Sequence, residues 1–172
     1  MLKPLLQLYN LLDINSAKFL ERGLMPVAFI DVYRSQPLQP ELYEYYNMPA
    51  IFVDYSMSGN GIGQRRTVQM TLHVLTDELP DASNISEQRD EGLKRFLYQL
   101  TLQEVLEGSV LGKTTALKFL SENTIDAPVI NYHAQMYQFD CFLSDMAGDA
   151  TTILGEFERL NIFGSLRQMV NK

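Results

Sequence analysis

The chain has 172 residues, of which 46% are hydrophobic, and this predicts one soluble globular domain with an ordinary core. Its 14 basic and 21 acidic residues give a formal net charge of −7, which disfavours a nucleic-acid partner, because phosphate binding rests on Lys and Arg. Cys141 is the only cysteine, so the chain forms no internal disulfide and has too few thiols for a structural zinc site.

The N-terminal segment predicts two packing helices. Apolar residues from Leu2 to Leu12 recur at the three- and four-residue spacing of one helix face. Polar residues interrupt the segment, so it makes a poor signal peptide. No apolar run approaches the roughly 18 residues of a membrane span, and we expect no membrane partner. A short second helix is expected from a capping Ser16 to Leu20, closed by Gly23.

A strand and a long connection follow. The β-branched and aromatic residues of Val27–Tyr33 predict a first strand. The connection after it is rich in proline and carries Tyr43, Tyr45 and Tyr46. Tyrosines on such a segment either contact a partner or fold back over the sheet edge, and the sequence leaves both readings open.

Two further strands are predicted as a hairpin, Ala50–Ser56 and Arg65–Thr76, joined by the loop GNGIG. A strand pattern on both sides of this loop argues against a dinucleotide-binding fingerprint. In the second strand apolar residues alternate with Thr67, Gln69, Thr71 and His73, which predicts one core face and one polar face. That polar face is either wet or in contact with another protein. Arg65 and Arg66 at its start suit an acidic partner, although exposure is the ordinary state of arginine.

The main helix is expected to begin near Asn84 or Ser86 and to stop at Gly108. Its expected apolar stripe consists of Leu93, Phe96, Leu97 and Leu100. The last strand, Tyr132–Ser144, is aromatic enough to lie inside the sheet.

The elements together predict an α+β fold. We expect a mainly antiparallel sheet of about four strands packed against one long helix, with N- and C-terminal helices. The expected domain organisation is one α+β domain over residues 1–148, including the N-terminal helix, and a C-terminal helical extension over residues 149–172.

The stretch GSVLGKTTAL suggests a nucleotide-binding phosphate loop, but its spacing is wrong. Such a loop has four residues between its first glycine and the Gly-Lys pair, so that backbone N–H groups surround the phosphates. Only three residues separate Gly108 from Gly112, and Glu107 occupies the position where the glycine is needed. A helix rather than a strand is predicted before the loop. Gly112 and Lys113 are instead expected in an exposed link to a short amphipathic segment around Leu117.

No catalytic or metal-binding constellation is apparent. His73 and His133 could touch across adjacent strands, but no carboxylate is placed beside them. Cys141 shares a face with aromatic residues and is expected to be a small buried hydrophobe. The aspartates at strand ends show no pairing for acid–base work. We therefore expect no enzyme activity, no cofactor and no metal.

Four stretches carry a resemblance to a known family: MPAIFVDYS, QRRTVQMTLHVLTD, NISEQRDEGLKRFLYQL and YHAQMYQFDCFLSD. Together they resemble the tail-terminator or tail-completion proteins of long-tailed bacteriophages and their head–tail joining relatives. In that family a proline-led strand, a second long strand, a helix and a return strand with alternating aromatic residues recur in this order. The resemblance is one of organisation over roughly Pro49 to Asp145, and the segments up to Pro40 and after Met146 depart from the family pattern.

The resemblance implies a non-catalytic virion or prophage structural protein. Such a protein forms a ring at the head–tail junction, contacts tail-tube or head-connector proteins, and is found in the host cytoplasm during assembly and then in the virion. The alternative is a bacterial protein-interaction adaptor module, and a small-ligand or nucleotide-binding protein is a third class. The residues expected at the interface are Tyr43, Tyr45, Tyr46, Arg65, Arg66, Thr67, Gln69, Thr71 and His73.

Overall fold

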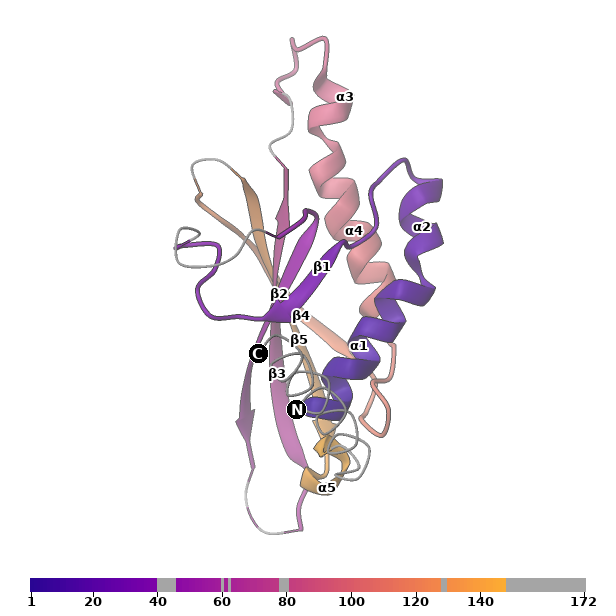
Figure 1. The fold of residues 1–172 in the computed structure, drawn as a ribbon, viewed down its shortest axis with the longest axis vertical. Helices are drawn as coiled ribbons and strands as arrows, with labels where there is room; N and C mark the ends of the chain where they lie inside the picture. The colour runs from indigo at the N-terminus through magenta and orange to yellow at the C-terminus, as the bar shows by residue number, and fades with distance from the viewer. Residues whose placement is uncertain (40–45, 60, 62, 78–80, 128–129, 148–172) are drawn as a thin grey trace, which may run out of the picture.

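The computed structural model contains one five-stranded sheet with helices on one side (Figure 1). It describes residues 1–39, 46–59, 61, 63–77, 81–127 and 130–147. The strand order is β1 (Phe29–Val32), β2 (Ala50–Ser58), β3 (Arg66–Thr76), β5 (Asn131–Cys141) and β4 (Lys118–Ile125). The first two strands are parallel to each other, and the remaining neighbours are antiparallel.

The helices come from three parts of the chain. The first pair is α1 (Leu2–Ile14) and α2 (Ser16–Glu21), the second is α3 (Arg89–Gly92) and α4 (Lys94–Leu106), and α5 (Leu143–Met146) follows the last strand. The mixed, mainly antiparallel α+β class is therefore confirmed. The predicted extension over residues 149–172 lies outside the described residues.

The expected single long helix is wrong, because the helix is interrupted at Leu93. The Phe96 N–H donates to the Leu93 carbonyl, a three-residue step that differs from the four-residue step of an α-helix. Gly92, a poor helix former, directly precedes the interruption. The predicted start at Asn84 or Ser86 is also too early, since α3 begins at Arg89 without a side-chain cap.

The expectation of about four strands is wrong as well, because β4 was not predicted. This segment pairs along β5 and forms one edge of the sheet. The register shifts between Phe119 and Ser121, so the alternation of buried and exposed side chains is broken at that point. That break explains why the sequence pattern resembles a short amphipathic link.

The main core lies between the helices and the sheet. Leu8 of α1, Phe19 of α2 and Leu102 of α4 are buried there against β3 and β5. The predicted alternation of β3 is confirmed, since its buried residues on this side are Val68, Met70, Leu72 and Val74.

Three of the four residues in the predicted apolar stripe of the main helix face away from this core, whereas Leu97 packs against it. The exposed fractions of Leu93, Phe96 and Leu100 are 40%, 47% and 56%. The side of α4 that faces the sheet instead carries Tyr98, Gln99, Thr101, Leu102, Val105 and Leu106. Packing against the sheet, rather than the number of apolar residues on a face, sets the rotation of this helix.

Candidate functional site

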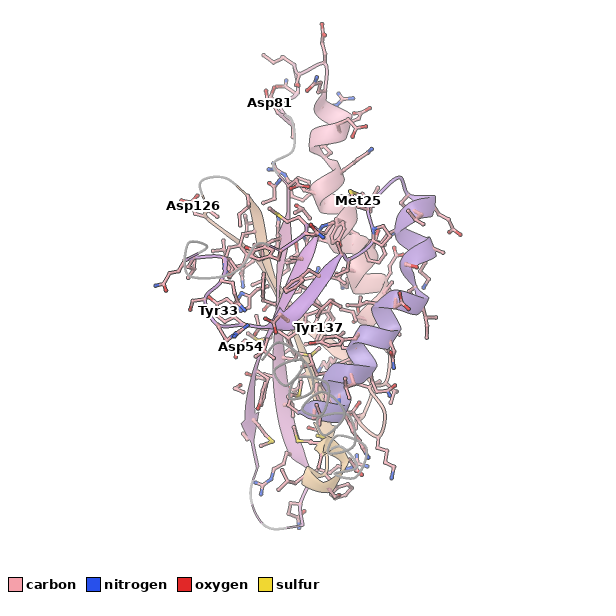
Figure 2. The ribbon with its side chains drawn as sticks, viewed as in Figure 1. Met25, Tyr33, Asp54, Asp81, Asp126 and Tyr137 are labelled. Carbon is pink, nitrogen blue, oxygen red and sulfur yellow. The ribbon has the colours of Figure 1, made fainter. Side chains whose placement is uncertain are left out.

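The candidate site is the side of the sheet that lies away from the helices, called here the open face. Figure 2 shows Tyr33 and Asp54 on this side and Tyr137 on the helix side. Opposite residues of paired strands point to the same face of a sheet. The predicted residues of β3 therefore share the open face with their partners in β2, in the pairs Phe52–His73, Asp54–Thr71, Ser56–Gln69 and Ser58–Thr67.

The open face has two halves of different chemistry. The aromatic patch consists of Phe29, Tyr33, Tyr46, Phe52, His73 and Tyr132. The polar patch consists of Asp54, Ser56, Ser58, Thr67, Gln69 and Thr71.

His73 is held inside the aromatic patch by two tyrosines. Its ring stacks on Tyr33 with 3.9 Å between centroids, and its Nδ1 lies 2.7 Å from the Tyr132 hydroxyl. Burial lowers the pKa of His73, and the Asp54 carboxylate acts in the opposite direction. The imidazole is therefore mainly neutral at physiological pH, and it can form one hydrogen bond with the Tyr132 hydroxyl in this neutral state.

Tyr46 also belongs to the aromatic patch. Its ring stacks on Phe29 at 5.7 Å and meets the edge of Phe52 at 4.9 Å. Of the two readings of the loop tyrosines, folding back over the sheet is thus the one that Tyr46 adopts. Tyr43 and Tyr45 lie outside the described residues.

The polar patch offers hydrogen-bonding groups from a rigid surface. Gln69 is exposed and Thr71 is partly exposed. The Thr67 hydroxyl donates to Asp140 Oδ1 at 2.7 Å, which uses one carboxylate oxygen inside the protein. The exposed carboxylate of Asp54 lies at the end of the patch that is nearest His73. Such a surface can bind through hydrogen bonds, and its groups do not form a nucleophile–base pair.

Arg65 and Arg66 lie at the tip of the β2–β3 hairpin, at the far end of the polar patch. The Arg65 guanidinium stands over the Phe142 ring at 5.3 Å from its centroid. The Arg66 side chain passes so close to Gly59 that a larger residue there would displace it. Arg66 and His73 are seven positions apart along β3, or about 24 Å of strand. The predicted interface residues therefore form an extended surface rather than one compact site.

The helix side of the sheet holds a buried polar network that sequence reasoning missed. Gln135 Nε2 donates to the Gln99 carbonyl at 3.0 Å and to Glu122 Oε2 at 2.8 Å, and its Oε1 accepts from the Tyr137 hydroxyl at 2.9 Å. His133 is buried beside this group, with Nδ1 3.5 Å from Glu122 Oε1. The one available sequence signal was polar residues at inward positions of an aromatic strand.

The two histidines do not form a site together. The register pairs His73 with Ala134 and His133 with Val74, so the imidazoles lie on opposite faces of the sheet. Cys141 is buried, and burial raises the pKa of its thiol. Across the described ranges, no group of three or more His, Cys, Asp or Glu side chains is arranged to hold a metal ion.

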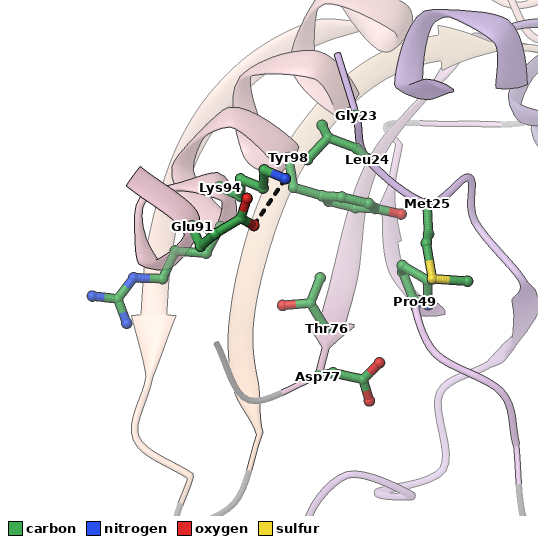
Figure 3. A pocket seen from close by; sticks show the side chains of 10 residues that line it. Gly23, Leu24, Met25, Pro49, Thr76, Asp77, Glu91, Lys94 and Tyr98 are labelled. Carbon is green, nitrogen blue, oxygen red and sulfur yellow. Dashed lines mark ion pairs between the residues drawn. The ribbon is translucent and has the colours of Figure 1, made fainter. Parts of the chain in front are cut away.

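A cavity of about 220 Å³ lies between the start of α4, the segment after α2 and the ends of β2 and β3 (Figure 3). The Thr76 and Tyr98 hydroxyls border it, but both atoms are inaccessible to water and lack hydrogen-bond partners in the described part of the chain. The Lys94–Glu91 ion pair, at 2.8 Å, is part of its wall. The cavity therefore presents an ion pair and largely apolar walls rather than converging hydrogen-bond donors.

The GSVLGKTTAL stretch closes on itself as a tight loop. The Gly108 N–H donates to the Leu117 carbonyl at 2.9 Å, and the Leu117 N–H donates to the Ser109 carbonyl at 2.7 Å. The Leu111 N–H donates to the Thr114 hydroxyl at 3.1 Å. Several N–H groups that a phosphate would need are thus used within the loop. The helix stop at Gly108 is confirmed by its φ of 79°.

No known family model matches the chain, and no curated protein is similar enough to count as a relative. Of the helices in the described ranges, none is both long and apolar enough to cross a membrane.

Proposed function

We propose that the protein is a non-catalytic structural protein of a tailed bacteriophage or prophage, a tail-terminator or tail-completion protein. It self-associates into a ring at the head–tail junction and contacts tail-tube or head-connector proteins. The order β2, β3, α3–α4 and β5, over the four stretches that carry the resemblance, supports this proposal, although β4 is inserted between α4 and β5.

The observation that carries the proposal is the polar patch of the open face. Its amide and hydroxyl groups lie on paired strands whose backbone is already ordered. Binding a partner therefore costs little additional conformational entropy. Arg65, at the hairpin tip, extends this surface with positive charge on a chain of formal net charge −7, whereas Arg66 alternates with Thr67 and belongs to the helix side. A rigid polar surface with arginine at one end suits a specific protein contact, since arginine is enriched at such interfaces.

Self-association is tested with the purified full-length chain. Light scattering at increasing protein concentration, followed by negative-stain electron microscopy, is expected to show a closed ring. A strictly monomeric protein at the highest concentration would contradict the proposal.

The polar patch is tested by changing its charge without disturbing the core. A Gln69→Lys, Thr71→Lys variant is expected to lose binding to a tail-tube or connector protein encoded beside this gene. Leu100→Lys, on the exposed side of α4, is the matched control and should bind as the wild type does. Equal binding by all three proteins would exclude the polar patch as the contact.

The bacterial adaptor module remains the alternative function. Neighbouring genes separate it from the first, because portal, capsid and tape-measure genes are expected only around a phage structural gene.

A further inference from the structure

One edge of the sheet is open over the second half of β2. The parallel strand β1 pairs with β2 only as far as the pair Val32–Val53, and the Tyr33 N–H donates to the Val53 carbonyl at 2.9 Å just beyond it. Asp54–Ser58 continue the strand and pair with β3 on the other side. These five residues, called here the open edge, are all exposed.

The open edge presents unpaired backbone groups. The Val53 carbonyl points towards β1. The backbone N–H and C=O groups of every second residue in a strand point to the same side, so those of Tyr55 and Met57 point outward from the sheet edge. The Tyr55 N–H is taken by its neighbour's carboxylate, Asp54 Oδ1, at 2.7 Å. Within the described residues, the Tyr55 carbonyl and both backbone groups of Met57 have no hydrogen-bond partner.

The opposite edge of the sheet is better protected than this one. β4 has a register shift after Phe119 and carries Lys118, and both features are common devices against edge-to-edge pairing. The open edge has a regular register and contains no lysine, arginine or proline, and its one charged residue is Asp54. Tyr55 and Met57 are 45% and 44% exposed, so apolar side chains flank the unpaired backbone groups.

We propose that the open edge pairs with the open edge of a second copy of this chain, antiparallel, about a twofold axis at Ser56. The outward backbone groups then meet in two pairs, Tyr55 with Met57 of the partner and Met57 with Tyr55 of the partner. Each such pair of opposite residues exchanges two backbone hydrogen bonds, and the one from the Tyr55 N–H replaces its present bond to the exposed Asp54 carboxylate.

The side chains of the open edge are self-complementary in this register. Each tyrosine ring lies opposite a methionine, and sulfur–aromatic contacts are favourable. Each Asp54 lies opposite a Ser58, so the two carboxylates do not face one another. The same surface on both copies satisfies the requirement of a twofold interface.

The open edge is one surface through which the self-association in the proposed function can occur. This inference rests on the proposed function only in the expectation that copies of the chain associate. A twofold contact closes on two copies, so a ring needs a second, different contact.

Cysteine crosslinking of the full-length chain tests the register. Ser56 would face Ser56 of the second copy in a non-hydrogen-bonded pair with Cα atoms about 4.5 Å apart, which is within disulfide range. Mild oxidation of Ser56→Cys is therefore expected to give a covalent dimer. Ser58→Cys, whose partner is Asp54, and Asn123→Cys on β4 are matched controls and should stay uncrosslinked. The native Cys141 is buried and does not compete.

A second variant tests the contact without a crosslink. Met57→Pro removes an outward N–H and leaves the ladder to β3 intact, since proline is tolerated at sheet edges. It is expected to lower the average mass in light scattering, with the unfolding midpoint confirming that the variant folds.

The outcomes separate the two proposals. If the wild type associates but Ser56→Cys does not crosslink and Met57→Pro changes nothing, the open edge is excluded and the ring proposal stands. A Ser56-linked dimer without rings in the microscope supports the edge contact and contradicts the ring. A wild type that stays monomeric, with no crosslink, overturns both.

Discussion

The Tyr132 hydroxyl lies 2.7 Å from Nδ1 of His73, although the register pairs His73 with Ala134. The contact is therefore diagonal between neighbouring strands, within reach of a long aromatic side chain. Tyr33 stacks on the same imidazole, so residues from β3, from β5 and from the segment after β1 meet at one ring. The aromatic patch thereby ties the long connection between β1 and β2 to the centre of the sheet.

Tyr132→Phe keeps the ring and removes this hydrogen bond. Because it leaves a partly buried imidazole nitrogen without this partner, we expect a loss of about 1–2 kcal/mol in the free energy of unfolding, measured with urea at neutral pH. A double-mutant cycle with His73→Phe is the control. The two changes should be strongly non-additive, and simple additivity would show that the contact contributes nothing.

His133 predicts a dependence of stability on pH. Burial lowers the pKa of His133, while Glu122 raises it and Arg95 lowers it further. The unfolded chain, with an ordinary pKa of about 6.5, therefore binds protons first as the pH falls. The free energy of unfolding is full above that pKa and decreases from about pH 7 downward until the lower folded-state pKa is reached.

His133→Gln is expected to flatten this decrease between about pH 8 and about pH 5, as measured by chemical unfolding at each pH. His73, whose pKa is lowered as well, accounts for the slope that remains. Glu122→Gln removes the carboxylate that favours the His133 imidazolium and so lowers the pKa of His133 further. The stability of this variant should therefore fall over a wider range of acidic pH. A His133→Gln variant with the wild-type slope would rule out this assignment.

The rotation of α4 is tested by two leucines that are two residues apart. Leu102 is fully buried against the sheet, whereas Leu100 is 56% exposed. We expect Leu102→Ala to cost about 2–5 kcal/mol of the free energy of unfolding. Leu100→Ala should stay within about 0.5 kcal/mol. Urea titrations of both variants measure the difference. An equal loss of stability in the two variants would mean that α4 is rotated differently about its axis.

Gly108 is expected to resist substitution for a backbone reason. Its φ of 79° disfavours any side chain, while an added Cβ would meet no atom within 4 Å. Gly108→Ala should therefore cost about 1–2 kcal/mol in thermal or urea unfolding. Gly61→Ala is the matched control, because that glycine has no positive φ and its Cβ would make an ordinary contact with Gln64. A neutral Gly108→Ala would contradict the left-handed conformation.

The sequence predicted those elements whose pattern is set by one buried face. The alternation in β3 identified the strand and both of its faces, because Val68 to Val74 pack on the helices. The same reasoning failed for β4, where Phe119 and Leu120 are adjacent and the register shifts between Phe119 and Ser121. An irregular edge strand carries no period to detect.

The rotation of α4 could not be predicted, because its buried face is partly polar. Thr101 is buried and its hydroxyl donates to the Leu97 carbonyl at 2.7 Å, while Arg22 Nη1 donates to that hydroxyl at 2.8 Å. The Gln99 carbonyl accepts from Gln135, 36 residues away. Hydrogen-bond partners so far apart in the chain produce no local sequence pattern. Counting the apolar residues on each side of the helix therefore favoured the side that is mostly exposed.

The candidate site was predicted in the same partial way. The open face followed from the β3 alternation, and His73 and Gln69 do share it. Its division into an aromatic patch and a polar patch depends on the parallel pairing of β1 with β2, which brings Phe29 and Tyr33 over the sheet. Pairing between strands that are separated by a long connection cannot be predicted from the sequence of either strand alone.

The strand order has a consequence for synthesis on the ribosome. β4 precedes β5 in the chain, yet its neighbour in the described sheet is β5, which also completes β3. A nascent chain that ends before Asn131 has therefore made β4 without its partner and β3 with one side unpaired. β5, the last strand of the described residues, supplies the missing partner of both β4 and β3. Translational pausing between β4 and β5 would prolong the interval in which the growing polypeptide is most prone to aggregate.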